Sequence, residues 1–352
     1  MKKLIILILI LFPINIYADN GRSTVVMDID SGRIVYSKNM YEKKLIASTT
    51  KIMTCILVLE NMNLDKEIIV GEEVLSMYGT NIYLEVGEKI KVRDLLYGLM
   101  LRSGNDAALT LAINTFGTEE AFVKKMNSKA QEIGMKDTIF NNPHGLDDKT
   151  YNYSTAYDMA LLSKYAYQNK NYRKIIATKK YITKSSIKSY VWYNRVELLN
   201  KYKYSLGGKN GYTPKAGKTL VSVASKDDLT YTIVSLDDND IYNNHRYLYE
   251  KYFAKYKKFL IVDKDKFLKN PNLIKENLYI KKSFYYPLRK DEETEVVTLI
   301  KIFNEKNNQK VGEIYVIFDN NEIFRENVYV LNTDKKNDSF LQKVLSFFSS
   351  LF

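Results

Sequence analysis

Three short motifs bring together residue types that can carry out nucleophilic catalysis. In the first, Ser48 and Lys51 stand three positions apart in the sequence Ser48-Thr49-Thr50-Lys51. Positions i and i+3 share one face of a helix, so the lysine amine can reach the serine hydroxyl. A serine becomes a good nucleophile when a base accepts its proton, and a lysine does this once burial lowers the pKa of its amine. A capping serine followed by a solvated lysine is the alternative interpretation.

The second and third motifs supply polar groups and positive charge. Ser103-Gly104-Asn105 offers a hydroxyl that can relay a proton and an amide that can orient a substrate, although the same residue types favour an ordinary turn. Lys209-Asn210-Gly211 precedes a predicted strand. A lysine beside a small residue on an exposed strand edge would bind an extended, anionic substrate, whereas the alternative is a basic hairpin turn. Each motif alone is weak evidence for catalysis.

The elements that must position these motifs follow from the hydrophobic pattern. Alternating apolar residues and turn signals predict strands at 23–29, 33–37, 219–224 and 230–236. Helical periodicity predicts helices at 47–61, 91–101, 106–116, 119–133, 154–168 and 242–256. Two early strands, a helical middle and two late strands indicate an α+β domain whose antiparallel sheet is built from both ends of the chain. From about residue 258 onward, short β-rich stretches indicate a second, smaller all-β domain.

Composition excludes several classes of protein. The 352 residues are 45% hydrophobic, which rules out a disordered or collagenous chain. One cysteine excludes an intramolecular disulfide, and two histidines are too few for a histidine-rich metal centre. The net charge of +12 suits anionic partners such as nucleic acids, acidic wall polymers or lipid headgroups, and does not choose between them.

The first eighteen residues indicate export. Lys2 and Lys3 precede the apolar run 4–12, Pro13 ends that run, and Ala18 offers a small residue at a cleavage point. This order is typical of a secretory signal peptide, and the run is too short for a spanning helix. We therefore expect the protein to act at the outer face of the cytoplasmic membrane or elsewhere in the cell envelope, with no nucleic-acid partner.

In combination, the three motifs resemble those of the penicillin-recognising serine enzymes. The longer segments 47–54 and 101–108 are similar to those of D-alanyl-D-alanine carboxypeptidases, the low-molecular-mass penicillin-binding proteins. So are 143–147, 154–160 and 215–217, and the resemblance covers roughly residues 24–253. It implies a β-lactamase/penicillin-binding transpeptidase-like domain followed by the smaller all-β domain. The expected organisation is a signal peptide (1–18), a serine carboxypeptidase domain (19–256), a β-rich domain (257–334) and an amphipathic helix (335–352).

The resemblance also implies a reaction and a role for each site residue. Ser48 would form an acyl-enzyme with a peptidoglycan stem peptide and expel its terminal D-alanine, Lys51 would act as general base, and Ser103 would pass a proton to the leaving amine. The expected substrate-binding residues are Asn105, Lys209, Asn210, Gly211, Tyr212 and Arg195, with the backbone N–H groups of Ser48 and Tyr212 forming an oxyanion hole. β-Lactams would acylate Ser48, and neither a metal nor an organic cofactor is needed.

Two departures from the family pattern affect recognition of the substrate carboxylate. Asn210 stands where the family has the threonine of its K-T-G motif. Ile241 stands where many members have an arginine, and Arg195 could compensate in part. A β-lactamase-like hydrolase and a catalytically silent wall-binding module are the alternative functions. His144 and Cys55 are interpreted as structural residues.

The C-terminal segment is predicted to bind a membrane surface. Apolar residues from 340 to 352 fall on one side of a helix at 100° per residue, and lysines lie nearby. A helix of this length is too short to span a bilayer but can lie in its surface. A helix docked on the β-rich domain is the alternative.

Overall fold

The computed structural model describes residues 21–266, 278–302 and 310–330. The predicted signal peptide (1–18) and the predicted C-terminal helix (335–352) lie outside these ranges. The described chain forms two compact units. Unit 1 contains residues 21–225 and 230–251, and unit 2 contains 226–229 and the described residues from 252 onward. The domain boundary predicted after residue 256 stays a prediction, and α8 (Ile241–Lys255) runs through the division between the units.

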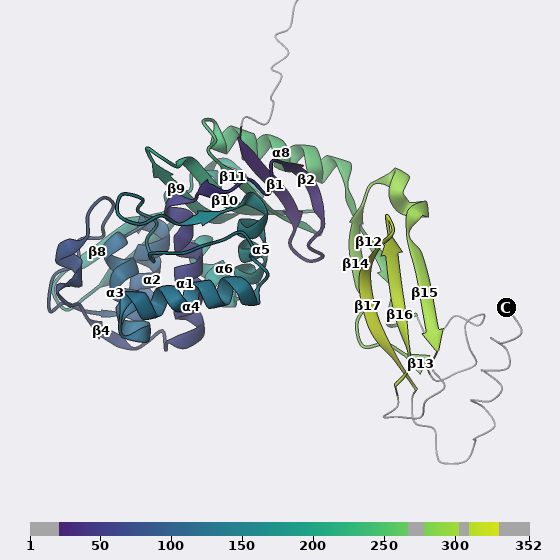
Figure 1. Ribbon diagram of the computed structural model, residues 1–352, viewed down its shortest axis with the longest axis horizontal. Coiled ribbons are helices and arrows are strands. Elements are labelled where there is room, and N and C mark those ends of the chain that lie inside the picture. Colours follow the sequence, from purple (N-terminus) through teal and green to yellow (C-terminus); the bar gives the residue numbers. More distant parts are fainter. Residues whose placement is uncertain (1–20, 267–277, 303–309, 331–352) are drawn as a thin grey trace, which may run out of the picture. The chain divides into compact units, whose positions relative to one another are not determined.

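A five-stranded antiparallel sheet in the order β2-β1-β11-β10-β9 forms the framework of unit 1 (Figure 1). Its strands are β1 (Ser23–Asp28), β2 (Ile34–Lys38), β9 (Ser205–Thr213), β10 (Gly217–Lys226) and β11 (Leu229–Leu236). The predicted α+β arrangement, with one sheet made from both ends of the chain, is confirmed. β9 lies at one edge of the sheet, so one side of this strand pairs with no other strand of the sheet.

Helices cover both faces of this sheet. Along β11, the Thr232 hydroxyl donates to Ser163 of α5 (Ala156–Tyr167) at 2.7 Å, whereas Ser235 contacts the His245 ring of α8 at 3.1 Å. Successive side chains of a strand point to opposite faces, so α5 and α8 lie on opposite sides of the sheet. Because both faces of the sheet are covered, all residues of β1 are buried. A strand with one face exposed to solvent would instead alternate buried and exposed residues.

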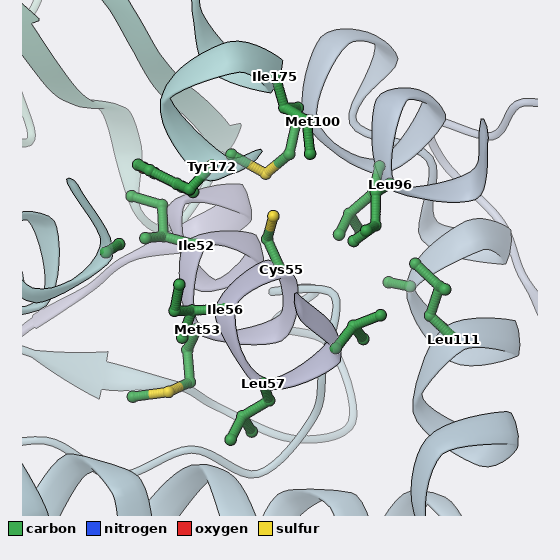
Figure 2. Packing of buried hydrophobic residues seen from close by; sticks show 14 of the residues in the cluster. Ile52, Met53, Cys55, Ile56, Leu57, Leu96, Met100, Leu111, Tyr172 and Ile175 are labelled. Carbon is green, nitrogen blue, oxygen red and sulfur yellow. The ribbon is translucent and has the colours of Figure 1, made fainter. Parts of the chain in front are cut away.

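A buried helix, α1 (Lys51–Asn61), lies at the centre of the hydrophobic core of unit 1. Its first eight residues are all buried, as expected for a helix that is apolar on nearly every face. Figure 2 shows its side chains pointing into the surrounding elements, whose labelled residues are Leu96, Met100, Leu111, Tyr172 and Ile175. Cys55 is one of the buried α1 residues, and burial raises the pKa of its thiol, which suits the structural role predicted for it.

The remaining elements of unit 1 surround this core. The other helices are α2 (Val92–Tyr97), α3 (Asn105–Phe116), α4 (Glu119–Glu132), α6 (Lys170–Ile176) and α7 (Leu198–Lys201), with 3-10 turns η1 (Ala47–Thr50) and η2 (Glu72–Ser76) and a π-helical turn η3 (Gly98–Arg102). Short strand pairs are formed by β3 (Lys44–Leu45) with β6 (Tyr153–Ser154), β4 (Glu67–Ile69) with β5 (Lys89–Lys91), and β7 (Lys180–Lys184) with β8 (Ser189–Tyr193). The sequence interpretation had not included α6 or the β7–β8 hairpin.

Unit 2 is built mainly of strands, as predicted. β12 (Lys257–Val262) pairs with β14 (Phe284–Leu288), and a second sheet has the order β13-β17-β16-β15. The members of that sheet are β13 (Leu278–Tyr279), β15 (Val297–Ile302), β16 (Lys310–Phe318) and β17 (Asn321–Val330), and the 3-10 turn η5 (Lys290–Glu295) precedes β15. Unit 2 has a small hydrophobic core of its own, in which Val316 and Val328 are fully buried. Among the described residues, no helix is long and apolar enough to cross a membrane.

Candidate active site

Ser48 and Lys51 meet where η1 passes into α1. The Lys51 Nζ lies 3.0 Å from the Ser48 Oγ, as the i, i+3 spacing predicts. The same nitrogen lies 2.7 Å from the Asn105 Oδ1 and 2.5 Å from the His144 backbone oxygen. A neutral amine has two N–H groups and one lone pair. The Asn105 Oδ1 and the His144 backbone oxygen can only accept hydrogen bonds. If they accept from the two N–H groups, the lone pair remains to accept a hydrogen bond from the Ser48 O–H.

The environment of Lys51 favours this neutral amine. The side chain is fully buried, and burial together with the positive charge of Lys209 holds its pKa well below the ordinary value, while the Asp106 carboxylate opposes this in part. Asp106 does not face Lys51 alone, because its carboxylate accepts hydrogen bonds from the backbone N–H groups of Ile82 and Leu84. Lys51 can therefore serve as a base toward Ser48.

Asn105 links Lys51 to the segment that carries Tyr78. As the first residue of α3, it accepts from Lys51 and donates from Nδ2 to the Tyr78 backbone oxygen at 2.7 Å. Both ends of its amide are thus occupied, which fixes the orientation of the side chain. The sequence did not indicate the parts played by Tyr78 and His144, because both contribute a backbone carbonyl that any residue type could supply.

Ser103 occupies a strained position between η3 and α3. Its backbone φ is 66°, in the left-handed region that non-glycine residues rarely adopt. Its Oγ is buried and has no hydrogen-bond partner among the described residues. Buried hydroxyls normally find a partner, and strained residues cluster at functional sites. Ser103 therefore has a hydroxyl available to a bound molecule.

The edge strand β9 passes close to the nucleophile. A Cβ atom added at Gly211 would lie 2.7 Å from the Ser48 backbone nitrogen and 3.1 Å from the Ala47 Cβ, so only glycine permits this approach. The next residue, Tyr212, has a side chain that is 65% exposed. The close approach brings the backbone of β9 beside the Ser48 backbone nitrogen, at a strand that lies at the edge of the sheet.

Lys209 adds a second buried amine. Its Nζ donates to the Asn210 backbone oxygen at 2.6 Å, and burial together with the Arg195 charge lowers its pKa to about 7. The Arg195 side chain, in turn, donates from Nη1 to the Thr80 Oγ1 at 3.3 Å. Positive charge therefore gathers along this end of β9.

Asn210 is held by a residue that the sequence interpretation missed. Its Nδ2 lies 3.3 Å from the Tyr242 hydroxyl and 3.5 Å from the Arg195 backbone oxygen. Ile241, at the position of the family arginine, is buried at the start of α8 and brings no charge. The next residue, Tyr242, carries the contact instead, and a single tyrosine among 29 gave no signal in the sequence.

The contacts of His144 suit the structural role predicted for it, with one addition. Its Nδ1 accepts from the Leu146 N–H at 3.1 Å, and burial lowers the pKa of the ring to about 3, so the ring is neutral. Its backbone oxygen holds Lys51, as described above. Within the described ranges, no group of three or more His, Cys, Asp or Glu side chains is arranged to hold a metal ion.

A sheet covered by helices on both faces, with a serine–lysine pair beside an edge strand, defines a serine hydrolase of the penicillin-recognising class. The model of the D-alanyl-D-alanine carboxypeptidase family matches residues 15–240, and the chain belongs to this family.

Relatives and solved structures agree with that assignment. D-alanyl-D-alanine carboxypeptidase DacF of Bacillus subtilis is 37% identical over 218 residues, which cover 60% of this chain and 56% of that protein. The match therefore spans little more than half of DacF. Penicillin-binding protein 5 from Haemophilus influenzae has a TM-score of 0.75 at 25% identity, covering 90% of this chain and 98% of that one. D-alanyl-D-alanine carboxypeptidase DacD from Francisella tularensis has a TM-score of 0.70 at 28% identity, with 95% and 97% covered.

Proposed function

We propose that the protein is a serine-type D-alanyl-D-alanine carboxypeptidase that trims peptidoglycan stem peptides. The observation that carries this proposal is the Lys51 Nζ, which lies 3.0 Å from the Ser48 Oγ and is held by two further oxygens. Family membership and the names of the relatives support the substrate class.

Acylation begins with proton transfer from the Ser48 hydroxyl to the neutral Lys51 amine. The Ser48 Oγ attacks the carbonyl carbon of the penultimate D-alanine, and negative charge develops on the carbonyl oxygen. The backbone N–H groups of Ser48 and Tyr212 stabilise this charge, and one such donor is worth about 2.7–4 kcal/mol. The close approach of Gly211 to the Ser48 nitrogen supports this pairing of donors.

Collapse of the tetrahedral intermediate breaks the peptide bond. The leaving nitrogen takes up a proton that originates on Lys51 and passes through Ser103, and D-alanine departs. Water then attacks the ester, giving the shortened peptide and restoring the Ser48 hydroxyl. The buried Ser103 hydroxyl, which lacks a partner in the described structure, supports its role as the relay.

Substrate binding uses the free edge of β9. The stem peptide lies along this strand in an extended form, with Lys209, Asn210 and Arg195 near its terminal carboxylate. Asn105 positions Lys51 and contacts the substrate backbone. A β-lactam resembles the D-alanyl-D-alanine unit and acylates Ser48 in the same way.

The test is release of D-alanine from a diacetyl-L-lysyl-D-alanyl-D-alanine peptide by the purified protein. The proposal predicts one D-alanine per peptide cleaved, together with a penicilloyl adduct that decays slowly. Rapid turnover of penicillin without release of D-alanine would instead indicate a β-lactamase. Neither reaction would indicate a silent wall-binding module.

We also propose that the protein is exported and held at the membrane surface. The charged and apolar order of residues 1–18 supports export, and the family's occurrence among bacterial wall enzymes agrees with it. The apolar and lysine pattern of residues 335–352 supports attachment to anionic headgroups.

A further inference from the structure

A cluster of positive charge beside β9 has no acidic partner among the residues that the structure describes. The Arg195 guanidinium makes its hydrogen bond to the Thr80 hydroxyl, and the positive charge of Arg102 acts with burial to lower the pKa of Arg195. Within the described ranges, neither arginine pairs with a carboxylate, and the buried Lys209 Nζ bonds to a backbone oxygen. The Arg102 charge helps to lower the pKa of Arg195, and the Arg195 charge helps to lower the pKa of Lys209, so this place favours an anion.

The Tyr242 hydroxyl ties together three elements at this cluster. It belongs to α8, donates to the Arg195 backbone oxygen at 3.2 Å, and lies 3.3 Å from the Asn210 Nδ2 on β9. The backbone N–H of Glu197 also faces the phenol, and burial raises the pKa of Tyr242, so its hydroxyl stays protonated. One hydroxyl thus fixes both the Asn210 side chain and the backbone that carries the Arg195 guanidinium.

The contacts of Asn210 bear on whether its side chain can bind the substrate carboxylate. Its amide nitrogen has two N–H donors, and these face the Tyr242 hydroxyl and the Arg195 backbone oxygen. With both donors directed at protein oxygens, the amide is poorly placed to donate to a substrate carboxylate as the family threonine would. Arg195, whose guanidinium donates to Thr80 and keeps further N–H groups without a partner in the described part of the chain, is better suited to that contact.

We propose that Tyr242 is a specificity-determining positioning residue: through Asn210 and the Arg195 backbone, it holds the Arg195 guanidinium where it receives the terminal carboxylate of the substrate. This arrangement replaces the threonine and the arginine that the chain lacks at Asn210 and Ile241. The inference rests on the proposed function for the identity of the carboxylate.

The test compares ligands that differ only in the carboxylate. Acylation rates are measured with benzylpenicillin and its methyl ester, and peptide cleavage with diacetyl-L-lysyl-D-alanyl-D-alanine and its C-terminal amide. The variants are Tyr242→Phe, Arg195→Gln, Asn210→Ala and the Tyr242→Phe/Asn210→Ala pair. Tyr247→Phe is the matched control, since Tyr247 also lies on α8 and contacts Lys251.

The parent is expected to prefer the acid over the ester or amide. Arg195→Gln should reduce that preference by about 10- to 150-fold, the range for a hydrogen bond to a charged group. Tyr242→Phe should reduce it by about 3- to 10-fold, as for a neutral hydrogen bond, and the double variant by no more than the larger single effect. The preference is the ratio of the acid rate to the ester or amide rate of the same variant, so changes common to both ligands cancel, and Tyr247→Phe should match the parent.

An unchanged preference in Tyr242→Phe, an equal loss in Tyr247→Phe, or a parent that does not distinguish acid from ester would each overturn the inference. A misfolded variant would lower ester and acid rates together and so would not mimic the expected result. If the parent reacts with penicillin but releases no D-alanine, the proposed function fails, while the penicillin pair still tests Tyr242.

Discussion

At Lys51, two backbone or amide oxygens and one hydroxyl surround a nitrogen that has no exposed surface. Burial and the nearby Lys209 favour the neutral amine over the ammonium. Because the neutral form is the one that accepts the Ser48 proton, acylation should rise with pH as Lys51 loses its proton, and this rise forms the acid limb of the profile.

Replacing Asn105 with aspartate should move that limb. A carboxylate in place of an oxygen that lies 2.7 Å from the Lys51 Nζ favours the ammonium and raises the Lys51 pKa. We expect the acid limb of the penicillin acylation rate to shift upward by about 1–3 pH units in Asn105→Asp. Asn61→Asp, at the other end of α1, is the control. A limb that stays in place or moves to lower pH would mean that Lys51 is not the base.

The alkaline limb should depend on Lys209. Its pKa is lowered to about 7 by burial and by Arg195, so its positive charge is lost as the pH rises through neutrality. Removing the Arg195 charge raises the Lys209 pKa, and the Arg195→Gln variant should keep its reduced rate to higher pH than the parent does. The measurement is kcat/KM for the peptide across pH 5–10, and an alkaline limb at the parent's position would argue against a role for the Lys209 charge.

Residues of the site were predictable where their side chains belong to a recognisable motif. They were not predictable where only a backbone carbonyl makes the contact. Ser48 and Lys51 follow from their spacing, and the Lys51 Nζ lies within hydrogen-bond distance of both the Ser48 Oγ and the Asn105 Oδ1. The carbonyls of His144 and Tyr78 carry no signal in the residue type. The catalytic and binding roles themselves stay predictions until they are measured.

Among the elements, the loop that carries His144 packs directly against the backbone of Ala47 and Ser48. Gly145 has a φ of 87°, and a Cβ atom there would overlap the Ala47 backbone oxygen and lie 3.0 Å from the Ser48 nitrogen. The turn from β9 to β10 is linked to the same loop, because Lys215 donates to the Asp147 backbone oxygen at 3.0 Å. The loop, η1 and β9 therefore keep one another in place.

Gly145→Ala should destabilise the protein more than an alanine at an equally unusual glycine. Gly117 has a φ of 89° and no atom within 4 Å of the added Cβ. Alanine at this position should therefore destabilise the fold only through its unfavourable backbone conformation, by about 1–2 kcal/mol. Overpacking adds about 1–3 kcal/mol at Gly145. Urea unfolding of both variants measures the difference, and penicillin acylation should slow only in Gly145→Ala. Equal losses of stability would show that the close contact is unimportant.

Elements were predictable where periodicity is strong. The early hairpin, α4 with its Thr118 cap and the late strands lie close to the predicted ranges. β7, β8 and α6 were missed, because segments of only five to seven residues leave little room for a period to repeat. The segment 91–101 was predicted as one helix, but it changes to a π turn at Gly98 just before Ser103, where tertiary packing sets the backbone.

For the whole molecule, the sequence predicts an export signal and a membrane-surface helix, and both lie outside the described residues. A chain ending at Asn337 should lose binding to vesicles containing anionic lipid, since a buried apolar face and nearby lysines supply that attraction. Its rate of D-alanine release in solution should match that of the full chain. Equal vesicle binding by the full and shortened chains would reject the membrane role of residues 338–352.

The central claim is that Ser48 forms the covalent intermediate with Lys51 as its base, and intact-protein mass spectrometry tests it most directly. After incubation with benzylpenicillin, the parent should gain the mass of one penicillin molecule, and Ser48→Ala should gain none while keeping the parent's circular dichroism spectrum. Release of D-alanine from the peptide should be lost in the same variant. A penicilloyl adduct that persists on Ser48→Ala would contradict the account.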